Sequence, residues 1–409
     1  MEKEKISRAL CKLGLSVVLM TLILLVNASA SQPSSLRRMA ARIGLLVGTA
    51  VNPALFSNPE YAGTLARQNV MKWRTTEPAE GVFNFRPGDR VVAFARAHHM
   101  KVRGHNLLWG IYNPAWLTDG HFTPAQLRSI MKTHILMEVR HYRGAVFAWD
   151  VVNEAFDRRG RLKHSIWYDQ PGIGLAGRGT AYIAQAFRWA RQADPRALLF
   201  YNDYQAEGIN AKSNAIYAMV KDFKRRGIPI DGVGLQMHLP VSGSVPPCLA
   251  ANIARLAKLG VQVQVTEMDV WLPLSGRQQV AGRQVAAQAE IYRRVARICA
   301  ENPDCTFQIR QQVIKRQFAA QARIYRRVAR ICAENPGCTA FQTWGFTDRH
   351  SWVPHFLKGQ GDALIFDAAY QPKSAYHAVF AAFRRTWKTN PAIRDQRLRF
   401  FRQTAARRR

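Results

Sequence analysis

Two glutamates stand directly after apolar segments that are typical of buried strands. Glu154 follows the run 146–153, and Glu267 follows the run 261–266. The carboxyl ends of parallel strands open on one face, so the two side chains are expected to meet there. Paired carboxyls in one cleft suit glycoside cleavage, in which one is a protonated acid and the other an ionised nucleophile or base. On spacing alone, both could also be ordinary surface charges at strand ends.

Further polar and aromatic side chains end the other apolar runs. Tryptophan faces stack on the C–H faces of sugar rings, while amide and imidazole groups hydrogen-bond to hydroxyls. A cleft with this lining suits a neutral polyhydroxylated ligand, although each residue alone could also belong to the core. The residues concerned are Lys72, His105, Trp109, Asn202, Asp203, Gln236, His238, Trp344 and Trp352.

A metal site is the competing interpretation of the histidines and acids at these strand ends. The sequence has no HExxH pair, no EF-hand loop and no glycine-rich phosphate loop between a strand and a helix. We therefore predict chemistry that needs neither a metal nor a cofactor.

The elements that must position these groups alternate regularly along the chain. Segments with helical periodicity, such as 182–193 and 211–226, separate eight β-rich runs. Eight strands with intervening helices predict a single parallel (β/α)8 barrel, the TIM barrel. The predicted strands are 43–51, 69–73, 101–109, 146–153, 197–204, 232–238, 261–269 and 339–344.

A near-exact repeat interrupts this rhythm. Residues 286–306 match 319–339 except at Glu290/Arg323 and Asp304/Gly337. A solenoid would need at least three such units, so a tandem duplication of one helix and its turn is favoured. An error in joining gene segments would leave the same pattern. We expect an extra helix between the seventh and eighth strands.

The two ends of the chain differ from the barrel, which is predicted to span 31–389. Residues 1–30 combine a basic start, a short apolar run and Ala28-Ser29-Ala30, as a cleaved secretory signal does, although an uncleaved anchor is the alternative. The segment 390–409 is basic and lacks a pattern of apolar residues that would predict packing in the core, so it is predicted to be a disordered tail. The mature protein is expected to be soluble and exported, without a membrane segment.

The charge is strongly positive, because 59 lysines and arginines stand against 27 acids and give a formal net charge of +32. Such a surplus suggests nucleic acid, acidic surfaces or anionic polymers as partners. No helix-turn-helix or base-stacking platform accompanies it, so nucleic acid is not predicted. An acidic polysaccharide or an anionic cell-envelope polymer remains as the partner that the charge suggests.

Four of the six cysteines form two equally spaced pairs, Cys299/Cys305 and Cys332/Cys338. Cysteines six residues apart at a helix end can be bridged, and an exported protein meets an oxidising compartment. Zinc binding is the alternative, although no CxxC spacing supports it. Cys248 is left over as a candidate buried thiol.

The strand-end segments together resemble glycoside hydrolase family 10, the endo-1,4-β-xylanases. They occur in the family's order over nearly all of the chain from about residue 36 to 383. The segments are GTAVNPALF, QNVMKW, VRGHNLLW, WDVVNEAF, YNDY, GLQMHL, VTEMDV and TWGFTDRHSW.

The resemblance implies a role for each matching residue. Glu154 would be the acid/base and Glu267 the nucleophile of a retaining mechanism, with carboxyls about 5–5.5 Å apart. Asp269 would orient His238, which would in turn set the ionisation of the nucleophile. Xylan would be the partner of a monomeric enzyme, and Cys332 and Cys338 would be its disulfide. Substrate-binding roles would fall to Asn69, Lys72, His105, Trp109, Asn153, Tyr204, Gln236, His238, Trp344 and Trp352.

The chain also departs from the family pattern at Gln68, Gly110-Ile111-Tyr112 and Gln205, on the side that binds the non-reducing part of the substrate. The preferred length of the substrate chain is therefore expected to differ from that of the family. If the insertion disturbs Trp344 and Trp352, the barrel would instead be a catalytically impaired polysaccharide-binding protein.

Overall fold

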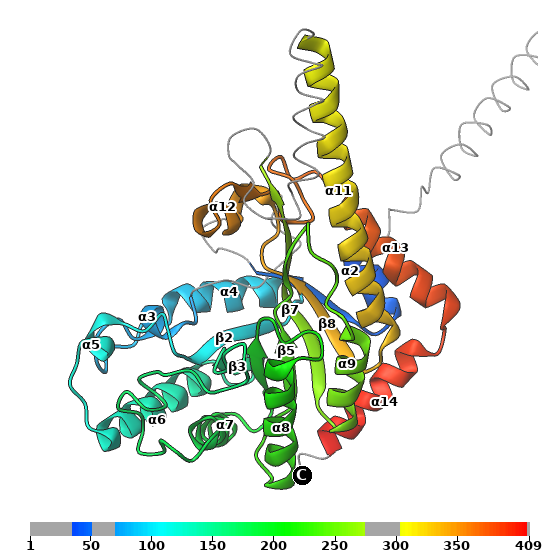
Figure 1. Ribbon diagram of the computed structural model, residues 1–409. Helices are drawn as coiled ribbons and strands as arrows, with labels where there is room; N and C mark the ends of the chain where they lie inside the picture. The colour runs from blue at the N-terminus through cyan, green and yellow to red at the C-terminus, as the bar shows by residue number, and fades with distance from the viewer. Residues whose placement is uncertain (1–34, 51–69, 275–302, 407–409) are drawn as a thin grey trace, which may run out of the picture.

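A computed structural model describes residues 35–50, 70–274 and 303–406. Its centre is a curled parallel sheet with the strand order β1-β8-β7-β5-β4-β3-β2 (Figure 1). Two short strands, β6 and β9, pair with β7 beyond this path. The strands are β1 (Leu46–Thr49), β2 (Val102–Trp109), β3 (Val146–Asn153), β4 (Leu198–Asp203), β5 (Gly232–Leu235), β6 (His238–Pro240), β7 (Gln262–Pro273), β8 (Cys338–Thr343) and β9 (Gln360–Gly361).

Helices connect the strands and cover the outside of the sheet (Figure 1). Polar residues start two of the longer ones, since capping boxes at Thr123/Gln126 and Asn210/Ser213 satisfy the first free N–H groups of α6 and α8. The helices are α2 (Leu36–Arg42), α3 (Trp73–Thr76), α4 (Arg86–Ala97), α5 (Ala115–Thr118), α6 (Pro124–His141), α7 (Ala181–Ala193), α8 (Ala211–Arg225), α9 (Leu249–Lys258), α11 (Pro303–Glu334), α12 (Val353–Phe356), α13 (Ser374–Thr389) and α14 (Ile393–Ala406).

The strand register aligns the polar residues that the sequence places at strand ends. Trp109 of β2 is level with Asn153 of β3, which is level with Asn202 of β4, and Asn202 is level with Gly234 of β5. These strands are buried on both faces, as covered parallel strands are. The residues that follow this layer, among them Glu154, therefore emerge at one end of the sheet.

Seven of the eight predicted strands are present, with ends shifted by a few residues, while the predicted second strand is wrong where it is described. Residues 70–72 form a turn, and Trp73 begins the short helix α3. The run Val70-Met71-Lys72-Trp73 is nonetheless buried, so its apolar character reflects packing and not strand pairing. Asn69 and residues 51–68 lie outside the described part of the chain.

The insertion differs in form from the separate extra helix that the repeat predicts. The end of the first copy, the connecting residues and most of the second copy form one continuous 32-residue helix, α11. The second copy packs against the barrel, since Tyr325, Val328 and Cys332 are fully buried. Residues 286–302 of the first copy lie outside the described residues.

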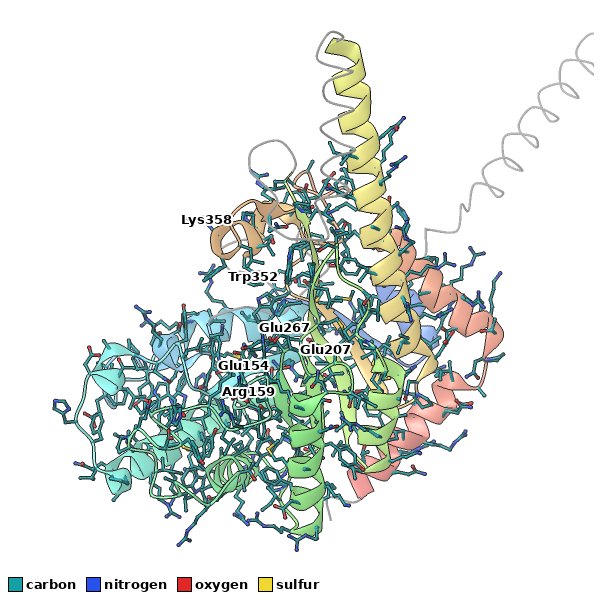
Figure 2. All side chains as sticks on the ribbon, viewed as in Figure 1. Glu154, Arg159, Glu207, Glu267, Trp352 and Lys358 are labelled. Atoms are coloured by element: carbon teal, nitrogen blue, oxygen red, sulfur yellow. A yellow bond between two sulfur atoms is a disulfide. The ribbon has the colours of Figure 1, made fainter. Side chains whose placement is uncertain are left out.

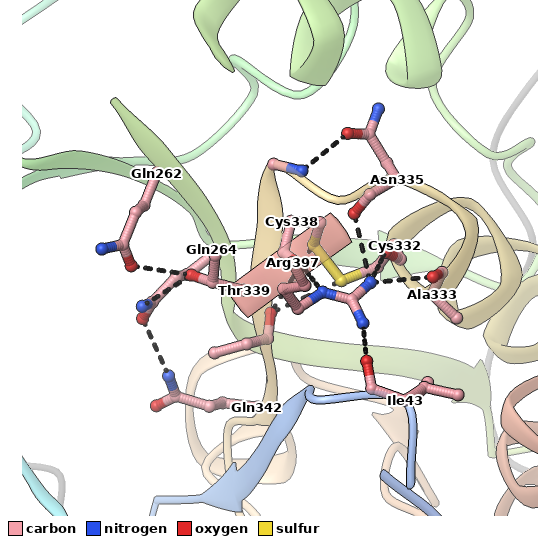
Figure 3. The surroundings of a disulfide bond; sticks show 12 residues. Ile43, Gln262, Gln264, Cys332, Ala333, Asn335, Cys338, Thr339, Gln342 and Arg397 are labelled. Atoms are coloured by element: carbon pink, nitrogen blue, oxygen red, sulfur yellow. Dashed lines mark hydrogen bonds between the residues drawn. A yellow bond between two sulfur atoms is a disulfide. The ribbon is translucent and has the colours of Figure 1, made fainter. Parts of the chain in front are cut away.

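The predicted disulfide between Cys332 and Cys338 is present, with its Cα atoms 5.1 Å apart (Figure 3). It joins the end of α11 to the first residue of β8. The pair Cys299/Cys305 cannot be compared, because Cys299 lies outside the described residues and the side chain of Cys305 is not described. Cys248 is exposed, contrary to the expectation of a buried thiol.

Residues 390–406, the described part of the segment 390–409, are not the disordered tail that its composition predicts. Residues 393–406 form α14, and the Arg397 side chain is fully buried. Its guanidinium donates to the carbonyl oxygens of Ala333 (2.8 Å) and Cys338 (2.9 Å) and also to that of Ile43 (Figure 3). Arg397 thus covers free carbonyl groups at the end of α11, which explains why a basic sequence can pack here. Within the described residues, no helix is long and apolar enough to cross a membrane.

Candidate active site

Glu154 leaves the end of β3 with an unusual backbone conformation. Its φ angle is 57°, in the left-handed region that few non-glycine residues adopt. The backbone is held by the Glu154 N–H, which donates to Asn202 O (2.9 Å), and by the next N–H, of Ala155, which donates to the Tyr201 hydroxyl (2.9 Å). This turn directs the carboxylate over the mouth of the barrel (Figure 2).

Three side-chain donors converge on the Glu154 carboxylate. Trp109 Nε1 donates to Oε2 at 3.1 Å, while Gln236 Nε2 and Asn153 Nδ2 donate to Oε1 at 3.0 and 3.2 Å. They come from three separate strand ends, as the sequence predicts. Both oxygens are therefore oriented before any ligand arrives.

Glu267 lies near Glu154 at the barrel mouth and is more deeply buried, with 4% of its surface exposed (Figure 2). Asn202 Nδ2 donates to its Oε1 at 2.7 Å, and His238 Nε2 donates to its Oε2 at 3.2 Å. Burial opposes the ionisation of Glu267. The hydrogen bond from His238 and the electrostatic effects of His105 and His238 outweigh burial and lower the pKa of Glu267 below its ordinary value. Glu267 is thus kept as a carboxylate.

His238 is held between two acids. Its Nδ1 lies 3.0 Å from Asp269 Oδ2, on the side opposite Glu267. Burial disfavours the charged ring, yet the charge of Asp269 and the two hydrogen bonds raise the His238 pKa well above its usual value. Trp352 Nε1 donates to the same Asp269 oxygen at 2.7 Å, so Trp352 is fixed to this array as well.

Amide side chains connect the two glutamates. Asn153 Oδ1 accepts from Asn202 Nδ2 at 2.9 Å and from Gln236 Nε2 at 3.2 Å, while the same Asn202 amide reaches Glu267. Gly234 makes room for this network, since a Cβ there would lie 2.1 Å from Asn202 Oδ1. A substitution at Gly234 would push Asn202 away from the carboxylate.

The opposite wall of the mouth combines a buried lysine with aromatic rings. Lys72 Nζ lies 4.7 Å from the centre of the Trp109 ring and 5.9 Å from that of Trp344. Burial lowers the Lys72 pKa to about 8, although Glu267 and Glu154 act to raise it. This side chain is an ammonium donor near both carboxylates. Trp344 in turn contacts His105 edge-on, with ring centres 5.3 Å apart.

A buried ion pair between Arg103 and Asp150 supports His105. His105 Nδ1 lies 3.0 Å from Asp150 Oδ2, and Asp150 is also held by Arg103 Nε at 3.0 Å. Burial raises the Asp150 pKa, but Arg103 and His105 outweigh it, so the pKa is lowered overall. His105 Nδ1 is 4.0 Å from Glu267 Oε1, which links this pair electrostatically to the carboxylate.

Tyr204 lies at the mouth next to two lysines, of which Lys163 has its Nζ 5.0 Å from the centre of the Tyr204 ring. Lys212 Nζ is 3.8 Å from the centre of its ring and 2.6 Å from Asp203 Oδ1. Burial raises the Asp203 pKa to about 6 despite Lys212 and the Tyr201 hydroxyl, which donates to Asp203 at 2.6 Å. The Tyr201 hydroxyl is the group that holds the N–H of Ala155, so this array reaches the backbone beside Glu154.

The structure therefore brings together every predicted site residue that it describes, while Asn69 lies outside the described residues. The roles implied by the family resemblance omit Asn202, which the strand-end pattern includes, while Asp150 and Arg103 appear in neither. Asn202 and Asp203 do end a predicted strand, which was a usable signal, but Arg103 and Asp150 fall inside apolar runs and give none. No cluster of three or more metal-ligating side chains occurs among the described residues.

Glycosidic bonds are cleaved between two carboxyl groups of this kind, and catalytic groups in parallel barrels come from the strand ends. The fold and the site together define a glycoside hydrolase. The model of glycosyl hydrolase family 10 matches residues 35–310 and, after the first copy of the repeat, residues 307–382. The chain belongs to this family, and its fold is the predicted (β/α)8 barrel.

Named relatives and solved structures agree with this membership. Endo-1,4-beta-xylanase B of Thermotoga neapolitana is 38% identical over 376 residues, which is 90% of this chain and 96% of the relative. The endo-1,4-beta-xylanase of Agaricus bisporus is 35% identical over 84% of this chain and 93% of its own. Xylanase 10B of Thermotoga petrophila RKU-1, solved in complex with xylobiose, superposes with a TM-score of 0.73 at 36% identity, over 87% of this chain and 98% of its own.

Proposed function

We propose that the protein is a secreted, retaining endo-1,4-β-xylanase in which Glu154 is the acid/base and Glu267 the nucleophile. The observation that carries the proposal is the pair of carboxylates supplied by β3 and β7 and joined through Asn153, Asn202 and Gln236. Family membership and the xylanases among the relatives support xylan as the substrate.

The two environments support this division of roles. Glu267 is buried and its pKa is lowered, so it is an anion that can attack the anomeric carbon. Glu154 is half-buried and borders a pocket lined also by Trp109, Lys163 and Ser165, so its carboxyl is more accessible than that of Glu267. A nucleophile must be ionised, whereas the acid must meet the leaving oxygen at the solvent side.

The reaction then proceeds in two displacements. A carboxylate oxygen of Glu267 forms a bond to the anomeric carbon while the glycosidic oxygen leaves and takes the proton of Glu154. Water next gives its proton to Glu154 and attacks the same carbon, which releases Glu267 as a carboxylate. Two inversions leave the configuration unchanged. Asn153 and Lys72 lie where they can bond to the sugar held on Glu267.

The test compares Glu154→Ala with Glu267→Ala in the presence of azide, using an aryl xylobioside with an activated leaving group. The nucleophile variant should yield the azide of inverted configuration, and the acid/base variant should yield the retained one. On xylan, Glu154→Gln and Glu267→Gln should each lose at least about 10²–10⁴-fold activity. Unchanged activity in either, or an inverted product from the parent enzyme, would contradict the assignment.

Export rests on the sequence of residues 1–30, whose basic, apolar and small-residue parts support a cleaved signal. Expression in a bacterial host with its own secretion route should give a mature chain beginning at Ser31, found by N-terminal sequencing outside the cytoplasm. A chain still beginning at Met1 in the membrane fraction would favour the uncleaved anchor.

A catalytically impaired polysaccharide-binding barrel is the second candidate, because of the repeat. Against it stand the ordered contacts of Trp344 with His105 and of Trp352 with Asp269, which α11 leaves in place. In-frame deletion of residues 290–322 separates the two functions. Activity that appears only after the deletion would favour the impaired barrel.

A further inference from the structure

Much of the positive charge that catalysis does not explain lies on four helices. Helices α2, α11, α13 and α14 pack on one side of the barrel, away from α4, α5 and α6 (Figure 1). Among their described side chains, the acids are Glu334 and Asp395. The exposed cations, which we call the basic face, are Arg37, Arg38, Arg42, Lys315, Arg316, Arg323, Arg326, Arg327, Arg330, Arg384, Arg385, Lys388, Arg394, Arg399 and Arg402.

The cations on α11 are not neutralised within the described part of the molecule. Arg323, Arg326, Arg327 and Arg330 are exposed, and no ion pair between described residues includes them. Arg323 and Arg327, and Arg326 and Arg330, stand four residues apart, so they are direct neighbours on the helix surface, where like charges repel. From Arg316 to Arg330 the row is about 21 Å long at the rise of an α-helix. Such a row matches an extended anionic polymer better than a small ion.

An exposed tryptophan lies within the same face. Trp387 of α13 is 37% exposed, and the guanidinium carbon of Arg42 lies 4.5 Å from its ring centre. Arg384 stands one helical turn before it, and Lys388 follows it. An aromatic face offers stacking to sugar rings, while the cations offer partners for carboxylates. Trp387 and its neighbours therefore combine both elements of acidic-sugar recognition.

We infer that the basic face is a second polysaccharide-binding surface, separate from the catalytic mouth, which binds xylan through its uronic acid side groups. The naming of xylan rests on the proposed function, whereas the preference for an acidic polymer rests on the charges and on Trp387. The surface holds a polymer chain next to the barrel while another segment of it occupies the mouth.

Two other anionic partners fit the observations less well. Duplex DNA is recognised by elements that enter a groove or stack on bases, and this face consists of helix sides with one exposed tryptophan. A membrane surface favours a helix with a broad exposed apolar face, whereas Trp387 is the only large apolar side chain described on α11 and α13 that is exposed. DNA is therefore included in the test as a competitor.

The test measures binding without catalysis, in the Glu267→Gln background, by retardation in native gels that contain soluble polymer. Three gels are compared: glucuronoxylan, the same polymer with its carboxyls reduced to alcohols, and duplex DNA at equal charge concentration. The test variant is Arg323→Ser/Arg327→Ser/Arg330→Ser, and the second is Trp387→Ala. Arg128→Ser/Lys132→Ser/Arg140→Ser on α6 is the matched control, since these cations are also exposed.

The triple α11 variant should bind glucuronoxylan at least about tenfold more weakly at low salt, with a shallower salt dependence, because three contacts are removed. Trp387→Ala should also weaken binding, and the α6 control should not. Equal binding to the carboxyl-reduced polymer, equal loss in the α6 control, unchanged binding by Trp387→Ala or tighter binding to DNA would each overturn the inference. If the binding results contradict the inference but the parent enzyme hydrolyses neutral xylan, the proposed function stands. Only the role of the basic face is then refuted.

Discussion

Replacing Arg397 with methionine tests whether the last helix is an integral part of the barrel. The substitution keeps the length and apolar stem of the side chain but removes every donor of the guanidinium. Arg397 is fully buried, and burial lowers its pKa to about 10, so it remains charged at neutral pH. Its partners are neutral carbonyl groups, and no acid would be left unpaired by the change.

The magnitude follows from the carbonyl groups that lose a donor. Ala333 O, Cys338 O and Ile43 O lose their guanidinium partner, while Cys332 O and Asn335 O each retain a backbone N–H. A buried acceptor left unsatisfied costs about 1–3 kcal/mol, and part of this is offset because a buried charge no longer has to be desolvated. We expect a net loss of about 2–4 kcal/mol in the free energy of unfolding.

Thermal unfolding followed by circular dichroism measures the effect, with the disulfide kept oxidised. Arg397→Met should lower Tm by about 4–8 °C, while activity at 25 °C is retained because Arg397 lies at the amino ends of the strands. The control is Arg399→Met, an exposed cation on the same helix, which should shift Tm by less than about 1 °C. Equal shifts in the two variants would refute the role of Arg397.

Three further predictions concern the catalytic mouth. Asp269→Asn should lower the pKa of His238, because the main charge that stabilises the imidazolium is removed, and the alkaline limb of the pH–rate profile should move to lower pH. Lys72→Met should raise KM for xylo-oligosaccharides about tenfold, and in the parent enzyme the affinity should fall as pH rises through about 8, where the ammonium is lost. Tyr201→Phe removes the acceptor for Ala155 N–H beside Glu154, the proposed general acid. Hydrolysis of xylan should therefore fall about tenfold, while that of a dinitrophenyl xylobioside, which needs no acid, should not. Equal losses would contradict the argument.

The sequence predicts the residues of the site better than it predicts the buried residues that hold them in place. Glu154, Glu267 and His238 stand where apolar runs end, and the common direction of parallel strands is enough to bring them together. Arg103 and Asp150 are invisible to this reasoning, since each lies within a strand and becomes meaningful only through its partner on the next strand. Pairing between distant residues of this kind leaves no periodic signal.

The errors in the fold have a similar cause. Val70, Met71 and Trp73 are apolar because they are buried, and burial alone does not distinguish a strand from a turn followed by a short helix. The segment after residue 390 looks like a solvated tail because arginine is seldom buried. Arg397 is the exception, since the free carbonyl groups at the end of α11 and at Ile43 provide its partners.

The packing of the second repeat copy has a consequence for how the chain folds. Two nearly identical segments are candidates for one groove, but a Cβ at Gly337 would lie 2.5 Å from Ala257 Cβ, and the first copy has Asp304 at this position. The first copy also continues from Thr306 directly to Phe307-Gln308, where the second has Ala340 before Phe341-Gln342, so it would enter β8 shifted by one residue with its faces reversed. We therefore expect the duplication to create a competitor during folding, which should reduce the yield and rate of refolding far more than the stability of the protein once folded.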